Sequence, residues 1–86
     1  MVKIWSDEMW VDYVYWQGMD KKTITRINML MKDIERNGVN NGIGKPEFLK
    51  HIKLWSRRID DTNRLIYNIC DGKLELYACR GHYEDK

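Results

Sequence analysis

Three residues of this 86-residue chain have the side chains needed to cut RNA. Cleavage of a phosphodiester by its own 2′-hydroxyl needs a base for the hydroxyl proton, an acid for the departing 5′-oxygen and a cation for the charge on phosphorus. Glu47 follows a proline in a turn beside lysines, Arg64 begins a strand-like segment, and His82 lies near the end of the chain. We take them as candidate base, cation and acid. Because many small proteins contain a glutamate, an arginine and a histidine, these residue types alone are weak evidence for RNA cleavage.

Each candidate also has a simpler interpretation. Glu47 could be an exposed loop acid paired with Lys45 or Lys50, as most such acids are. Arg64 could flank a strand and pair with an aspartate at 60 or 61, and His82 could be a surface residue. The positions that the fold gives these side chains must therefore decide between the two readings.

The pair Arg57-Arg58 offers one further cation, because neighbours on a strand point to opposite faces. Either could be a solvated strand edge, and we favour Arg58 as the residue that faces a phosphate. Simple alternation places Arg64 and Tyr83 on one face of a sheet and His82 on the other. A kink or bulge at Gly81 would bring the imidazole to the same side.

Two helices are expected in the first half of the chain. After a short strand at 2–5, Ser6 is a good N-cap for a helix that runs to about Gln17, with Gly18 as its C-terminal cap. Asp20 opens a second helix, whose apolar residues recur at three- and four-residue steps until Asn37-Gly38. Residues 39–44 are a flexible connection.

The second half alternates with a period of two over 54–59, 63–70 and 73–79, which predicts three antiparallel strands. A turn at Asp71-Gly72 pairs the last two. One face, packed on the helices, is predicted to hold the pairs Ile69 with Leu74, Tyr67 with Leu76 and Leu65 with Ala78. The other face is predicted to hold Arg64, Ile66, Tyr77 and Cys79. The element order β-α-α-β-β-β indicates a small α+β sandwich in which the first strand joins the same sheet. At this length we expect one domain, residues 1–86.

Composition restricts the functional classes only moderately. The net charge of +2 is too small to indicate nucleic-acid binding by itself. Basic residues are nevertheless concentrated between Lys45 and Arg64. No signal peptide or membrane span is visible, so the sequence reads as cytoplasmic. Cys70 and Cys79 would lie roughly 20 Å apart along the hairpin, too far for a disulfide, and without a histidine at ligand spacing they make a poor zinc site.

Whole strings of the sequence resemble a known family in their order along the chain. They are Lys-Ile-Trp-Ser at 3–6, Asp-Tyr-Val-Tyr-Trp-Gln at 12–17, Gly-Lys-Pro-Glu at 44–47, Leu-Lys-His at 49–51, Trp-Ser-Arg-Arg-Ile at 55–59, Arg-Leu-Ile-Tyr at 64–67 and Cys-Arg-Gly-His-Tyr at 79–83. Over residues 1–83 the chain resembles the YoeB-type toxins of the RelE superfamily. The resemblance implies a RelE-like fold and a ribosome-dependent endoribonuclease that cuts messenger RNA in the ribosomal A site. It implies no metal or cofactor and a YefM-type antitoxin as partner; a homodimer stays open.

The resemblance also implies roles by motif position. Glu47 would be the general base, His82 the general acid and Arg64 the residue that stabilises the transition state. Tyr83 would position the scissile nucleotide, while Lys50 and Arg58, with Lys45 beside them, would bind phosphate. The chain departs from the family in Gly81, where relatives carry an aromatic residue, and in a short extension at 84–86.

Two other functions remain open on the sequence. One is a catalytically inactive relative that blocks the A site or acts with its antitoxin as a transcriptional co-repressor. The other is an interaction protein unrelated to translation.

Overall fold

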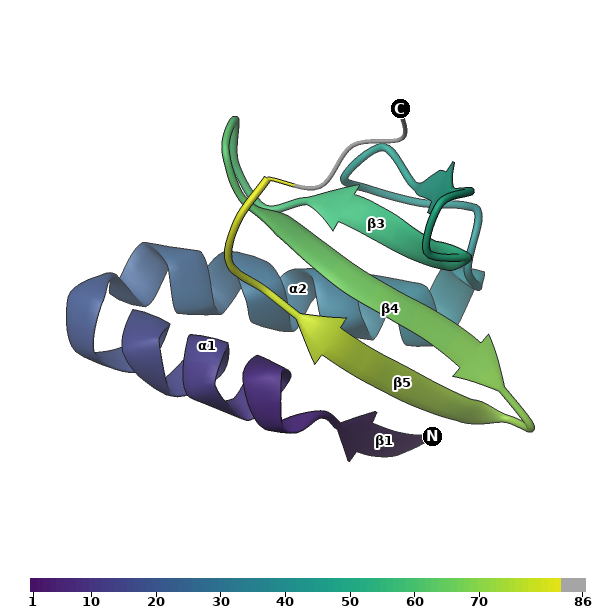
Figure 1. Cartoon of the computed structure of the whole chain (residues 1–86), viewed down its shortest axis with the longest axis horizontal. Helices are drawn as coiled ribbons and strands as arrows, with labels where there is room; N and C mark the ends of the chain where they lie inside the picture. The colour runs from purple at the N-terminus through teal and green to yellow at the C-terminus, as the bar shows by residue number, and fades with distance from the viewer. Residues whose placement is uncertain (83–86) are drawn as a thin grey trace.

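Two helices cover one face of a five-stranded sheet in the computed structural model, which describes residues 1–82 (Figure 1). The elements are β1 (Val2–Trp5), α1 (Asp7–Met19), α2 (Lys21–Asn37), β2 (Glu47–Leu49), β3 (Leu54–Arg58), β4 (Arg64–Cys70) and β5 (Lys73–Ala78). The strand order is β1-β5-β4-β3-β2. The predicted α+β class is confirmed, and the first strand does join the sheet.

The sheet differs from the prediction in two details. It is mixed rather than wholly antiparallel, because β1 pairs in parallel with β5. A parallel neighbour needs a long connection, and here the whole chain from α1 to β4 supplies it. The sheet also has an extra edge strand, β2, which pairs with β3. The sequence predicts a turn rather than a strand here, since the segment has only three residues and directly follows Pro46.

The helix boundaries follow from capping side chains. Ser6 caps α1 as predicted, accepting a hydrogen bond from the Met9 N–H at 3.0 Å. Asp20, rather than the predicted Gly18, ends this helix, because its N–H donates to the Trp16 carbonyl at 2.9 Å. The carboxylate of Asp20 then accepts from the Lys22 N–H at 3.0 Å and caps α2. One residue thus separates two helices.

The main core lies between the helices and the sheet. Its buried residues are Met9, Ile27, Leu30, Met31, Ile34, Ile59, Leu65, Tyr67, Leu74, Leu76 and Cys79. Trp5, Trp16 and Trp55 pack against this core, whereas Trp10 is 58% exposed. Most of the large aromatic area therefore serves packing, as expected for so small a domain. A second cluster of Leu49, Ile66 and Ala78 contains no helix residue and lies on the opposite, helix-free face of the sheet.

A β-bulge in β5 alters the predicted faces. The pairs nearest the Asp71-Gly72 turn are as predicted, but Ala78 pairs with Ile66 rather than Leu65, so Tyr77 is an extra residue in the ladder. Ala78 therefore lies on the helix-free face and Cys79 in the helix-side core, the reverse of our prediction. Strict alternation could not reveal the inserted residue, because a bulge changes which face each later residue occupies.

Two remaining observations concern membrane-spanning helices and the two cysteines. Within residues 1–82 no helix is long and apolar enough to cross a membrane. Cys70 is exposed and Cys79 buried, and both are free thiols.

Candidate functional site

Strand register places three predicted site residues on the helix-free face. Glu47 lies opposite Ser56, and Arg58 lies opposite Arg64. Ser56 and Arg58 are two residues apart on β3, so both point to the same side. Ile66, two residues from Arg64, packs in the helix-free cluster, which fixes that side as the uncovered face. Since neighbouring strands lie about 4.8 Å apart, the three side chains emerge from β2, β3 and β4 within about 10 Å of one another in the pairing direction.

Glu47 is exposed at the sheet edge. Its carboxylate forms neither a hydrogen bond nor an ion pair with any residue in the described part of the chain, so the simpler pairing with Lys45 or Lys50 is absent there. The backbone before it is fixed, because the Arg58 N–H donates to the Gly44 carbonyl at 2.7 Å. A carboxylate on a held backbone, open to solvent, is available to accept a proton.

Arg64 is only 5% exposed and is held in place by main-chain groups. Its Nη1 donates to the carbonyls of Asp60 at 2.7 Å and Asn63 at 3.2 Å. The expected alternative, an ion pair with an aspartate carboxylate at 60 or 61, does not occur among residues 1–82. The bonds to the protein use only Nη1 of the guanidinium, so the charge is positioned without being neutralised by a carboxylate of residues 1–82.

The chain leading to His82 runs beside the start of β4. The Arg64 N–H donates to the Gly81 carbonyl at 3.0 Å, and the Gly81 N–H donates to Asn63 Oδ1 at 2.9 Å. Gly81 has φ of +108°, a conformation that favours glycine. The exposed His82 follows directly. Simple alternation does not extend to His82, because β5 ends at Ala78, four residues before it.

Side chains of helix α1 hold the segment before His82 in place. Asp12 Oδ2 accepts from the Cys79 N–H at 3.0 Å, and Trp16 Nε1 donates to the Cys79 carbonyl at 2.8 Å. Burial raises the pKa of Asp12, and burial also raises the pKa of the Cys79 thiol to about 12, so this thiol stays protonated near neutrality. The guanidinium of Arg80 stacks over the Tyr15 ring, 3.6 Å from its centre. Together these contacts fix the residues just before the imidazole.

The three predicted phosphate-binding residues do not form one cluster. Lys45 lies at the Arg58 end of the face, since Gly44 bonds to Arg58. Lys50 lies in the turn after β2, beyond the Leu49–Leu54 pair, and Leu54 is four residues from Arg58. At about 3.3 Å per residue this is roughly 13 Å along the strand. Lys50 and Arg58 therefore suit different phosphates of one chain rather than a single phosphate.

Arg57 is fully buried, unlike its exposed neighbour Arg58. It pairs with Asp33 and donates to Tyr67 Oη at 2.9 Å. Three of its bonds go to carbonyls of the loop after α2, at Gly38 (2.8 Å), Asn41 (2.7 Å) and Ile43 (3.0 Å). The preference for Arg58 as the outward cation agrees with this geometry, and the idea that both arginines form a solvated edge is wrong for Arg57.

The loop packs closely on this buried pair. A Cβ at Gly42, where φ is +120°, would lie 1.9 Å from Asp33 Oδ2 and 2.9 Å from Arg57 Nη1. Only glycine permits that approach. The loop that we expected to be flexible is thus held against the sheet and delivers Lys45 and Glu47 to its edge.

Two of the sequence expectations fall outside the described residues, namely Tyr83 and the extension at 84–86. Within the described part of the chain, no three His, Cys, Asp or Glu side chains gather in a way that could hold a metal ion.

Comparison with known proteins identifies the family. The model of the YoeB-like toxin of bacterial type II toxin–antitoxin systems matches residues 5–83. Toxin YoeB of Escherichia coli strain K12 is 49% identical over an 85-residue alignment that covers 96% of this chain and 100% of that toxin. The chain belongs to the YoeB family of toxins.

Solved YoeB structures share the whole fold. In the heterotetrameric YoeB–YefM toxin–antitoxin complex of Staphylococcus aureus, the matching chain is 41% identical with a TM-score of 0.89, over 96% of this chain and 98% of that one. The YoeB dimer of the same organism is also 41% identical, with a TM-score of 0.91 and the same coverage. In those proteins, YoeB is thus seen both with YefM and as a dimer.

Sequence reasoning missed two features of this YoeB-family site. One is the clamp of Arg57 and Asp33, and the only available signal was the glycine-rich run at 38–44 with an acid and an arginine elsewhere in the chain. The other is the support of the His82 segment by Asp12, for which the sequence has no signal, because the contact joins residues 67 positions apart.

Proposed function

We propose that this YoeB-family toxin is a ribosome-dependent endoribonuclease that cuts messenger RNA in the A site by metal-independent acid–base catalysis. The observation that carries the proposal is the register of the sheet, which puts Glu47, Arg58 and Arg64 on one uncovered face. Family membership supports it independently. Translation would stop because the message is broken.

The chemistry assigns one role to each group. Glu47 takes the proton of the 2′-hydroxyl, whose oxygen attacks phosphorus, and the bond from phosphorus to the 5′-oxygen breaks. His82 gives its proton to that leaving oxygen, and Arg64 stabilises the extra negative charge on the phosphate oxygens. The products are a 2′,3′-cyclic phosphate, which water can open to a 3′-phosphate, and a 5′-hydroxyl.

Other residues would bind the substrate. Arg58 and Lys45 would hold phosphates near the cut, and Lys50 a phosphate farther along the chain. Tyr83 would position the scissile nucleotide. We further propose that the protein acts in the cytoplasm and is inhibited by a YefM-type antitoxin, in keeping with the S. aureus complex.

Induction of the toxin in cells, with and without a YefM-type antitoxin, tests this function. Primer extension on a reporter message should show breaks that follow the codon register, and co-expression of the antitoxin should abolish them. Stalled but uncut message would instead favour an inactive protein that only blocks the A site. Normal growth and intact messages would contradict the proposal altogether.

A further inference from the structure

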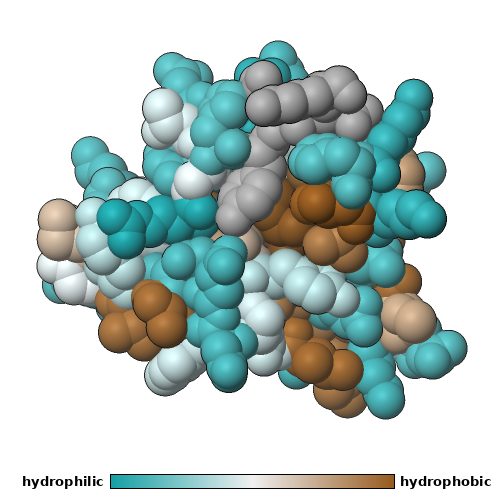
Figure 2. Space-filling model, viewed as in Figure 1, coloured by the Kyte–Doolittle hydropathy of each residue, from teal (hydrophilic) through white to brown (hydrophobic). Residues whose placement is uncertain are grey.

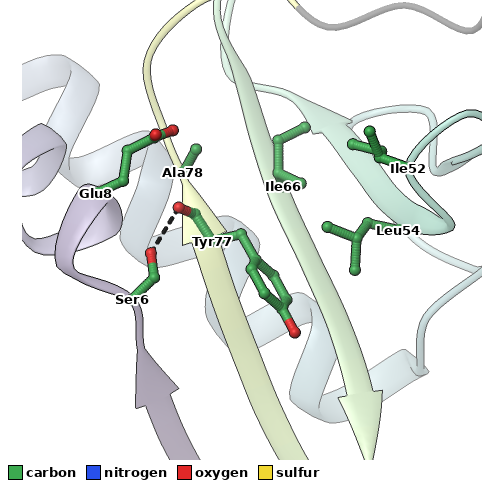
Figure 3. Close-up of a pocket in the computed structure, with 7 residues that line it drawn as sticks. All are labelled: Ser6, Glu8, Ile52, Leu54, Ile66, Tyr77 and Ala78. Carbon is green, nitrogen blue, oxygen red and sulfur yellow. Dashed lines mark hydrogen bonds between the residues drawn. The ribbon is translucent and has the colours of Figure 1, made fainter.

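An apolar hollow lies on the helix-free face, beside the candidate site. It has a volume of about 360 Å³ and is lined by Ser6, Glu8, Ile52, Leu54, Ile66, Tyr77 and Ala78 (Figure 3). The space-filling view of this side shows hydrophobic atoms gathered in patches among hydrophilic ones (Figure 2). Among residues 1–82, none of the catalytic or phosphate-binding residues assigned above lines the hollow.

The hollow results from the bulge in β5. The extra residue brings Tyr77 and Ala78, which are consecutive, to the same cluster with Ile66. Ala78 has the smallest side chain among the lining residues, and this leaves space next to it. Ser6 fixes one wall, because its hydroxyl donates to the Tyr77 carbonyl at 2.7 Å and its N–H to the Leu76 carbonyl at 2.9 Å. The hollow is therefore already formed in the free protein.

Its position is close to the candidate site on the same face. Ile66 lies two residues from Arg64 along β4, which is about 7 Å. Leu54 lies on β3 between the Lys50 turn and Arg58. A chain of phosphates that follows the cations from Arg64 and Arg58 toward Lys50 would pass along this hollow.

We propose that the hollow binds a nucleobase of the message next to the phosphate that is cut. The inference rests on the function proposed above. Proteins that hold single-stranded nucleic acid combine cations for the backbone with apolar or aromatic surfaces for the bases. Here Leu54, Ile66 and Tyr77 supply the apolar surface, and the arginines beside it supply the cations. Glu8, the one charged residue of the lining named above, would repel a phosphate, so the phosphates are placed at the arginines and the base in the hollow. The arginines beside the apolar surface favour a nucleotide over an apolar side chain of a protein partner.

The test is a thermodynamic cycle measured on ribosomes programmed with an uncleavable message that carries a 2′-O-methyl group at the cut. The Kd of the toxin is measured with the natural message and with messages abasic at the nucleotide on either side of the cut. The cycle compares the natural protein with Ala78→Leu, which fills the hollow, and with Val14→Leu, which adds one carbon rather than three on the exposed side of α1. Ile52→Ala, at a residue 39% exposed, provides a second variant with little risk to folding.

Loss of the base at one of the two positions should weaken binding of the natural protein and of Val14→Leu by about tenfold. Ala78→Leu should bind natural and abasic messages equally, and Ile52→Ala should show a reduced difference. The inference is overturned if neither abasic message binds more weakly to the natural protein, or if the variants in the hollow keep the full difference. It is also overturned if Ala78→Leu weakens only the complex with the antitoxin, which would make the hollow a protein-docking site.

The two proposals fail in different ways. A toxin that binds programmed ribosomes with a base-dependent Kd but does not cut natural message would refute the nuclease and leave the hollow supported. A toxin that cuts the message without any base dependence at the hollow would refute only the hollow.

Discussion

At the level of single residues, Arg57 and Arg58 show how one residue type serves two purposes. Arg57 is buried with Asp33 and bonds to the loop carbonyls, whereas Arg58 is exposed on the face of Glu47. A buried charge is stable only while its partners are present. Arg57 should therefore matter for folding and Arg58 for the RNA.

We expect Arg57→Leu to lower the free energy of unfolding by about 3 kcal/mol, because the carboxylate of Asp33 and several loop carbonyls lose their donor. Arg58→Ala, the adjacent exposed residue, should change it by less than about 0.5 kcal/mol and should reduce cleavage instead. Urea denaturation and a cleavage assay on the same two variants separate the effects. Equal stability of the two variants would contradict the role given to Arg57.

Asp33 gives this clamp a pH dependence. Burial would raise the pKa of Asp33, but hydrogen bonds from the Ile43 N–H, Arg57 and Asn37 outweigh it and lower the pKa below its usual 3.8. Because the folded pKa is depressed, ionised Asp33 stabilises the protein above about pH 4, and this contribution is lost as the pH falls through the folded pKa.

The unfolding free energy of Asp33→Asn should therefore be lower at pH 7 and should fall less between pH 7 and pH 3 than that of the natural protein. Urea titrations at both pH values measure the difference, with the exposed Asp61→Asn as control. If Asp33→Asn lost as much stability on acidification as the natural protein, the carboxylate would have no such role.

At the level of elements, Ser6 connects the start of α1 to the bulge of β5. Its Oγ accepts from the Met9 N–H at 3.0 Å and donates to the Tyr77 carbonyl at 2.7 Å. One hydroxyl thus caps a helix and satisfies the carbonyl of the extra residue in the ladder. The bulge in turn decides which residues lie on the helix-free face of the sheet.

Ser6→Ala should lower the free energy of unfolding by about 1–2 kcal/mol, because it removes the cap and leaves the Tyr77 carbonyl without its donor. Thr25→Ala is the matched control, since its hydroxyl donates to the Lys21 carbonyl on the exposed side of α2 and should contribute less than about 0.5 kcal/mol. Chemical denaturation of both variants provides the comparison. Similar losses in the two would show that the link to the bulge contributes nothing.

Elements whose signal is local could be predicted from the sequence. The cap at Ser6, the periodic helix ending at Asn37 and the hairpin turn at Asp71-Gly72 each depend on a few adjacent residues, and each is confirmed. The bulge at Tyr77 and the strand at Glu47–Leu49 could not be predicted, because the bulge changes the register without a mark in the alternation, and the strand has only three residues directly after Pro46. Tertiary pairing, rather than propensity, decides such features.

The same division applies to the candidate site. Alternation on one strand correctly separated Arg57 from Arg58, because that rule is local. The approach of His82 to the start of β4 depends on Gly81 bonding to Arg64 and Asn63, which no spacing in the sequence indicates. The motif resemblance supplied the grouping that the residues alone did not.

At the level of the whole molecule, the helices and the sheet have separate tasks. The helices bury one side of the sheet and anchor the loop and the C-terminal segment, leaving the other side to carry Glu47, Arg58 and Arg64. The sheet supplies a rigid frame that carries these three residues on the neighbouring strands β2, β3 and β4, and the segment that leads to His82 runs beside the start of β4. Rigid positioning of this kind would let the proposed acid and base act on one phosphate.

The most direct test of the account is the rate of single-turnover cleavage on programmed ribosomes, with the product ends identified. We expect Glu47→Gln and His82→Gln each to cut about 10²- to 10⁴-fold more slowly than the natural protein while binding antitoxin normally. The natural protein should leave a 2′,3′-cyclic phosphate and a 5′-hydroxyl. Cleavage at the full rate by either variant, or products with a 5′-phosphate, would contradict the assignment of Glu47 as base and His82 as acid.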